Sequence, residues 1–212
     1  SGLAASLRQA LALGPVHLSC YLLTREPGTP LAAAADRKEF TPLDDAAAGD
    51  LFDFSGQFLS KRGFARYEIS NFSRRRHYRS RHNLKYWQRR PYLGLGPAAH
   101  SYDGGKRSAN VGDLGEYLRR LETGRRPVAT TERLTRTQQM TEAVYLGLRL
   151  AAGVDMAAFE KEFGLDFDVL LVDLPDWLRN RQLLEVTGRR CRLTPAGMRF
   201  HETVAAELVS GF

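Results

Sequence analysis

The first third of the chain alternates between amphipathic helical patterns and apolar runs. Leucines recur at helical spacing over residues 3–13, and an apolar run at 16–23 predicts a strand covered on both faces. Residues 42–62 again carry a helical apolar stripe, with Thr41 as the expected N-cap, and 64–69 predicts a second strand. This α-β-α-β order is typical of the α/β class, with a parallel sheet and helices outside it.

The middle of the chain reads differently, with short elements close together. Residues 93–95, 98–102 and 107–111 predict short strands, and a hairpin turn separates the last two. A helix follows over 113–123, and the polar stretch 125–131 predicts a linker.

The residues after this stretch predict a second domain, so the expected domains are 1–124 and 132–212. Thr135 and Gln138 form a capping box for the first of three helices. A hairpin over 183–193 and a last helix complete a helical, winged-helix-like pattern. Such modules often bind DNA, but acidic residues are frequent here, so we expect packing and no nucleic acid.

The chain is basic, which favours anionic partners. Its 212 residues carry a formal net charge of +7, with a pI of about 9.7, and 43% are hydrophobic. Eight Lys or Arg residues fall between Arg74 and Arg90, with no Asp or Glu among them. This segment is either a solvated loop or an anion-facing surface, and an acidic lipid surface (a peripheral membrane contact) is one candidate partner.

Cysteine usage indicates a reducing compartment. Cys20 and Cys191 stand far apart, which gives neither a disulfide framework nor a metal motif. We therefore expect a cytoplasmic location. No apolar run has membrane-spanning length, and Ser1-Gly2 begins no signal peptide.

The candidate chemistry centres on two histidines. His82 stands beside Asn83, Tyr86 and Trp87, and His100 follows a glycine-containing turn. An imidazole can ligate haem iron or a metal, or act as a general base, and the aromatic rings could flank a flat ligand. Neighbouring arginines could bind its carboxylates. The alternative is that Tyr86 and Trp87 are core aromatic residues that bind no ligand. Without further information, the residue types favour this alternative over ligand binding.

Several motifs in register add a family resemblance that covers essentially the whole chain. The chain resembles the oxygen-independent coproporphyrinogen III oxidase-like family, and its haem-chaperone branch in particular, through Glu26–Pro30, Tyr67–Phe72, Arg81–Trp87, Tyr92–Gly96 and Ala99–Ser101. The resemblance implies a radical S-adenosylmethionine (SAM) fold: a partial β/α (TIM-like) barrel followed by a helical domain.

The resemblance also implies a function and cofactors. In this branch a His-Asn-x-x-Tyr-Trp motif, here His82, Asn83, Tyr86 and Trp87, is proposed to bind haem, which is then delivered to apoproteins. His100 is a second candidate haem contact, and His82 is the candidate iron ligand. The alternative implied function is that of an oxygen-independent coproporphyrinogen III oxidase, a radical SAM enzyme of porphyrin biosynthesis.

The sequence departs from the family at the cluster motif. The family's Cys-x-x-x-Cys-x-x-Cys loop, which holds a [4Fe–4S] cluster, does not occur, and two cysteines cannot replace three thiolates. We therefore expect a C-terminal fragment, inactive alone, whose intact protein would hold the cluster and SAM. Thr24 is the candidate remnant of the SAM site. A half barrel exposes a strand edge, which predicts association between copies.

Overall fold

The chain forms two compact units. The computed structural model describes residues 2–212, of which the first unit ends at Arg79 and the second spans Ser80–Phe212. This division falls inside the first of the two predicted domains, and the expected domains 1–124 and 132–212 stay a prediction.

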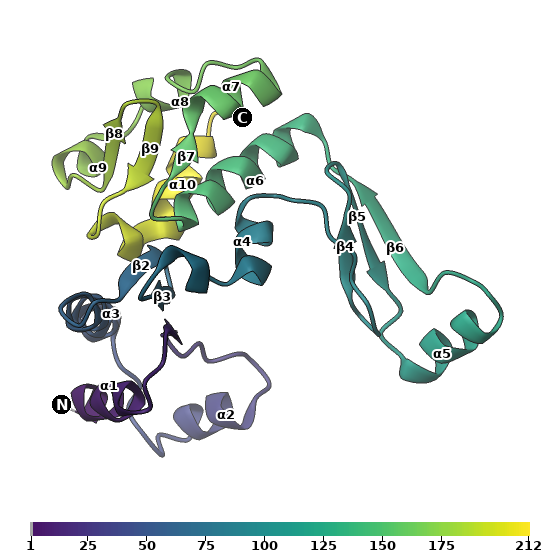
Figure 1. Ribbon diagram of the computed structural model, residues 1–212, viewed down its shortest axis with the longest axis horizontal. Coiled ribbons are helices and arrows are strands. Elements are labelled where there is room, and N and C mark those ends of the chain that lie inside the picture. Colours follow the sequence, from purple (N-terminus) through teal and green to yellow (C-terminus); the bar gives the residue numbers. More distant parts are fainter. Residues whose placement is uncertain (1) are drawn as a thin grey trace. The chain divides into compact units, whose positions relative to one another are not determined.

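The first unit is a small layer of helices beside a short sheet (Figure 1). Its elements are α1 (Gly2–Ala12), β1 (His17–Ser19), α2 (Pro30–Asp36), α3 (Asp45–Ser60), β2 (Ala65–Glu68), β3 (Asn71–Ser73) and the 3₁₀ turn η1 (Arg76–Tyr78). The helix predicted from residue 42 starts three residues later, because the Asp44 carboxylate accepts a hydrogen bond from the Ala47 N–H at 2.7 Å and caps α3 there.

The predicted parallel pairing in this sheet is wrong. The strand order is β1-β3-β2, and β3 runs antiparallel to both neighbours. β1 and β2 therefore point the same way but do not touch. The cause is a tight reversal after β2, where the buried Glu68 carboxylate accepts hydrogen bonds from the Ser70 N–H, at 3.1 Å, and from the Asn71 side-chain amide. The overall class, mixed α/β, is confirmed.

Burial explains why the first unit packs. Its core cluster consists of Leu7, Phe58, Leu59, Phe64 and Phe72, which α1, α3, the turn before β2 and β3 supply. The β3 strand is buried along its whole length, polar residues included, because it is the central strand.

The second unit holds two sheets and most of the helices. Its first part comprises α4 (Arg81–Trp87), β4 (His100–Tyr102), β5 (Lys106–Asn110), α5 (Leu114–Glu122) and β6 (Val128–Arg133). Figure 1 shows β4, β5 and β6 side by side, with α5 joining β5 to β6 at one end. Two expectations are corrected here. The predicted strand at 93–95 is not a strand, and most of the predicted linker belongs to β6, which pairs antiparallel with β5.

The second sheet lies among the remaining helices. These elements are α6 (Arg136–Arg149), β7 (Val154–Asp155), α7 (Met156–Phe163), α8 (Val169–Val172), α9 (Asp176–Asn180), β8 (Leu184–Thr187), β9 (Arg190–Leu193), η2 (Gly197–Phe200) and α10 (His201–Val209). The sheet order is β7-β9-β8, and both pairings are antiparallel. The capping box of Thr135 and Gln138 at the start of α6 is confirmed. Across residues 2–212, no helix combines the length and the apolar character needed to cross a bilayer.

Candidate ligand site on helix α4

Helix α4 carries the histidine motif, and local caps set its limits. The Ser80 hydroxyl accepts a hydrogen bond from the Asn83 N–H at 3.2 Å and so starts the helix. Arg89 has a left-handed φ of 52° and ends the turn that follows. Residues four apart share a helix face, so His82 with Tyr86 and Asn83 with Trp87 form two adjacent pairs.

Three aromatic contacts connect α4 with β4. The rings of His82 and Tyr86 meet edge to face with centres 5.0 Å apart, and those of Tyr86 and Tyr92 do so at 4.6 Å. Tyr92 and Tyr102 follow at 6.3 Å. We call these four residues the aromatic ladder. Edge-to-face pairs of this kind stabilise by about 0.5–1.5 kcal/mol each beyond their buried area.

A close backbone approach holds Tyr92 against β4. Tyr92 and Tyr102 exchange two backbone hydrogen bonds, of 2.8 and 2.9 Å. Two residues later the Gly94 N–H donates to the Ser101 hydroxyl at 3.0 Å. A Cβ at Gly94 would lie 2.1 Å from the His100 carbonyl oxygen, so only glycine fits there. The Tyr92–Gly96 motif therefore has a structural role, since it fixes the ladder.

Three cations lie along the ladder. The Lys85 ammonium is 4.9 Å from the centre of the Tyr86 ring and 5.3 Å from that of Tyr92. Arg89 donates to the Tyr102 hydroxyl at 3.4 Å, and Arg107 pairs with Tyr102 across the β4–β5 register. Burial raises the pKa of Tyr92, so its hydroxyl stays protonated at neutral pH.

Trp87 faces away from the ladder, towards α6. The Arg149 guanidinium carbon lies 4.2 Å from the centre of its ring. The indole Nε1 of Trp87 is buried and has no hydrogen-bond partner among residues 2–212. The motif is thus divided between His82 and Tyr86 on the ladder and Trp87 in the packing of the second unit.

The remaining predicted residues lie in different surroundings. Asn83 is half-buried, and its N–H completes the helix cap. His100 is exposed at the start of β4, opposite Ala109. Its neighbour two positions on, Tyr102, is the β4 residue that joins the ladder. Sequence reasoning missed Tyr92, Tyr102 and Lys85 as members of this site, although Tyr92 stands in a quoted motif.

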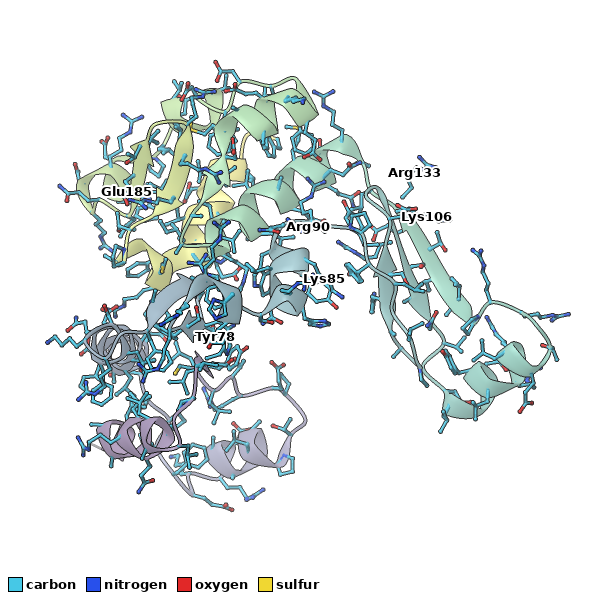
Figure 2. The ribbon with its side chains drawn as sticks, viewed as in Figure 1. Tyr78, Lys85, Arg90, Lys106, Arg133 and Glu185 are labelled. Atoms are coloured by element: carbon cyan, nitrogen blue, oxygen red, sulfur yellow. The ribbon has the colours of Figure 1, made fainter. Side chains whose placement is uncertain are left out.

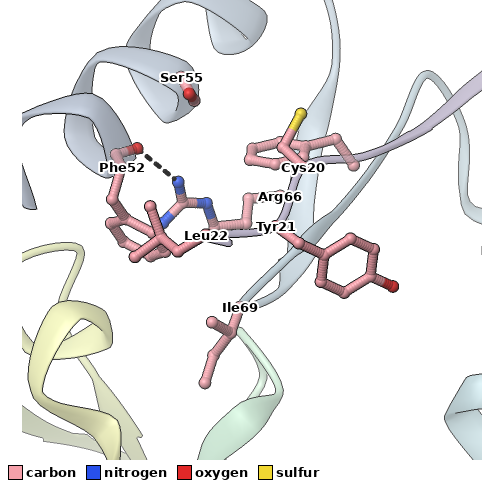
Figure 3. A pocket seen from close by; sticks show the side chains of 8 residues that line it. Cys20, Tyr21, Leu22, Phe52, Ser55, Arg66 and Ile69 are labelled. Carbon is pink, nitrogen blue, oxygen red and sulfur yellow. Dashed lines mark hydrogen bonds between the residues drawn. The ribbon is translucent and has the colours of Figure 1, made fainter. Parts of the chain in front are cut away.

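The first unit supplies the surroundings of Thr24 and Cys20. Strand β1 ends at Ser19, short of the expected 16–23, and Thr24 is exposed beyond it. A shallow cavity near Cys20 is lined by Phe52, Arg66 and Phe72 among others (Figure 3). Arg66 is engaged there, since it donates to the Phe52 carbonyl at 3.2 Å.

The cysteines do not fit an iron–sulfur cluster. Burial raises the pKa of the Cys191 thiol to about 12 and also raises that of Cys20. Within residues 2–212, no three His, Cys, Asp or Glu side chains gather as a metal site. A cubane cluster is held by several thiolates, and this chain offers two protonated thiols in separate units. No step is assigned to a cluster here.

The tip of the β8–β9 hairpin is electrically neutralised. Arg189 pairs with Glu160 and, at 3.2 Å, with Asp168. Arg190 pairs with Asp155 at 2.9 Å. These arginines are therefore satisfied inside the unit, where a phosphate-binding wing would present free charge.

Comparison with known proteins gives the class first. Residues 134–200 match the family model described as the HemN C-terminal domain. Among solved structures, the coproporphyrinogen III oxidase HemN of Escherichia coli, a radical SAM enzyme, superposes with a TM-score of 0.72 at 19% identity. The superposition covers 99% of this chain and 51% of that one. It shows a HemN-like fold.

Curated relatives narrow the family. The heme chaperone HemW of Bacillus subtilis is 30% identical over 192 residues, which cover 91% of this chain and 50% of the relative. HemW of Synechocystis is 34% identical over 202 residues, covering 94% and 48%. The chain is similar to the HemW heme chaperones over most of its own length, and it spans about half the length of these relatives.

Proposed function

We propose that this chain is part of a haem-binding chaperone that delivers haem to apoproteins. The observation that carries the proposal is the face of α4 formed by His82 and Tyr86, which begins the aromatic ladder. The chaperone name of the relatives agrees with it.

The residues on this face fit a flat iron-containing ligand. His82 is exposed, and its ring nitrogens form no hydrogen bond with any residue in the described part of the chain. An imidazole nitrogen in this state could hold the iron of a bound haem. Haem, when bound, supplies the iron for that bond, while Tyr86 offers an aromatic edge beside it. His100 is the second candidate contact.

The same proposal extends to architecture and surroundings. Residues 1–124 form the second half of a partial β/α barrel, whereas residues 132–212 form a winged-helix-like domain. The β7-β9-β8 order with α6 and α7 beside it supports the second assignment.

The protein works in the cytoplasm without nucleic acid, and its basic segment contacts acidic lipid surfaces. Copies of the chain associate through an exposed barrel edge. A clean monomer on gel filtration at high concentration would contradict this association.

The alternative is a radical SAM enzyme of the coproporphyrinogen III oxidase type. The HemN-like fold favours it. In this chain the donor set for a cluster does not fit, and exposed Thr24 is the one residue assigned to SAM. The cluster and SAM are therefore assigned to the intact family protein.

Titration with haemin tests the chaperone proposal. We expect a Soret band to develop on the 212-residue chain and to weaken in His82→Ala, because the substitution removes the axial nitrogen. The matched control is His77→Ala, an exposed histidine outside α4, which should leave the band unchanged. An identical spectrum in His82→Ala would exclude His82 as the ligand, and the same experiment on His100→Ala tests the second candidate.

A further inference from the structure

Lys85 is the cation on the aromatic ladder whose charge is not neutralised. Its side chain projects from α4 (Figure 2), and its ammonium lies 4.9 Å from the centre of the Tyr86 ring and 5.3 Å from that of Tyr92. No Asp or Glu in the described part of the chain forms an ion pair with it. Ring faces attract an ammonium group but leave its three N–H donors without oxygen acceptors.

The other two ladder cations are already paired. Arg89 forms an ion pair with Glu162 at 2.9 Å, and Arg107 forms one with Glu142 at 2.6 Å. Their charge is thus balanced within the unit. An anion that approaches the ladder therefore meets its uncompensated positive charge at Lys85.

Helix geometry places this charge beside His82. Lys85 follows His82 by three positions and Tyr86 follows it by four, so the three side chains emerge on the same side of α4. An imidazole, an aromatic edge and an ammonium group thus lie within one helical turn.

We propose that Lys85 receives a carboxylate of the bound macrocycle, with Tyr86 and Tyr92 as its aromatic support. The inference rests on the proposed function and gives the ligand's chemistry: a planar ring ligated by His82 that carries acidic substituents on its edge. A charge-assisted hydrogen bond from an ammonium to a carboxylate is stronger than a neutral one. The site should therefore discriminate between acidic macrocycles and their uncharged esters.

The test compares two ligands on three chains. Haemin and its dimethyl ester are titrated, in one detergent-containing buffer, into the wild type, Lys85→Met and the matched control Lys106→Met. Lys106 lies opposite Arg133 on β5, away from the ladder contacts, and its loss changes the net charge equally (Figure 2). Methionine keeps the apolar stem of Lys85, and unchanged circular dichroism verifies the fold.

We expect Lys85→Met to weaken haemin binding about tenfold, which corresponds to roughly 1.4 kcal/mol. Lys106→Met should bind haemin as the wild type does, and Lys85→Arg should restore most of the affinity. With the dimethyl ester, wild type and Lys85→Met should bind equally, because the carboxylates are masked.

The outcomes separate this inference from the proposed function. Haemin binding that depends on His82 but is equal in wild type and Lys85→Met overturns the role of Lys85 and leaves the haem proposal standing. An equal loss for haemin and the diester also overturns it, since the lysine would then act through packing. No haemin binding by the wild type overturns both.

Discussion

The guanidinium of Arg149 on α6 covers the indole ring of Trp87 on α4 at 4.2 Å. This contact packs Trp87 against α6, whereas His82 and Tyr86 lie on the aromatic ladder. The tryptophan of the motif therefore helps to fix α4 against its neighbour.

Arg149→Met should loosen α4. Removing a partly desolvated cation–π contact is expected to cost about 1 kcal/mol of unfolding free energy. In a Trp177→Phe background Trp87 is the remaining tryptophan of the sequence, so its emission should shift to longer wavelength as water reaches the ring. The emission wavelength of Arg149→Lys should lie between those of the wild type and Arg149→Met. An unshifted emission in Arg149→Met would contradict the packing role of Arg149.

Gly94→Ala should disrupt the ladder from outside it. The added methyl would meet the His100 carbonyl oxygen at 2.1 Å, and we expect a loss of about 2 kcal/mol or more in urea unfolding. Gly112→Ala is the control, because its Cβ would meet nothing within 4 Å, and it should change stability by less than about 0.5 kcal/mol. Equal stability losses in Gly94→Ala and Gly112→Ala would show that the close approach of Gly94 to the His100 carbonyl does not require glycine.

Glu68→Ala should destabilise the first unit. Glu68 is fully buried at 0% exposure, and its carboxylate accepts from Ser70 and Asn71 at the strand reversal. Leaving those donors unsatisfied is expected to cost about 2 kcal/mol, measured by urea unfolding with circular dichroism. The exposed pair of Arg37 and Glu39 gives the control, since Glu39→Ala should cost less than about 0.5 kcal/mol. Tryptophan fluorescence, which reports the second unit alone, should be unaffected.

His17 should make the first unit sensitive to mild acid. Burial lowers the pKa of His17 below 6.5, with a smaller opposing effect of Glu68, and its Nε2 lies 2.8 Å from the Tyr67 hydroxyl. The unfolded chain then binds a proton more readily than the folded one, so stability falls as pH drops through about 6.5 and levels off below the folded pKa. Urea unfolding at pH 7.5 and 5.5 should show a larger loss for the wild type than for His17→Gln. Equal losses would mean that another group titrates.

Local patterns predicted the elements whose causes are local. The capping box at Thr135 and the hairpin of β8 and β9 follow from a few adjacent residues, and both are confirmed. The start of α3 was misplaced by three residues because Asp44, not Thr41, provides the cap. Two good capping residues so close together compete, and the sequence does not rank them.

Non-local pairing decided what the patterns missed. The β1-β3-β2 order depends on a reversal that the buried Glu68 stabilises, and no periodicity reports that contact. The ladder likewise joins residues up to twenty positions apart, from His82 to Tyr102. His82 and Tyr86 stand together in one sequence motif, whereas Tyr92 and Tyr102 became neighbours only through the β-bridge between them.

The protonated state of both cysteines simplifies the spectroscopy of any iron-containing ligand. Ferric porphyrins take thiolate ligands readily, and a reactive surface thiolate would give a spectrum unrelated to α4. Burial raises the pKa of the Cys191 thiol to about 12 and also raises that of Cys20, so both thiols are protonated at neutral pH and are weak competitors for iron. Substitution of the five histidines one at a time, with both cysteines left in place, therefore tests which imidazole contributes to an iron-ligand spectrum of this chain.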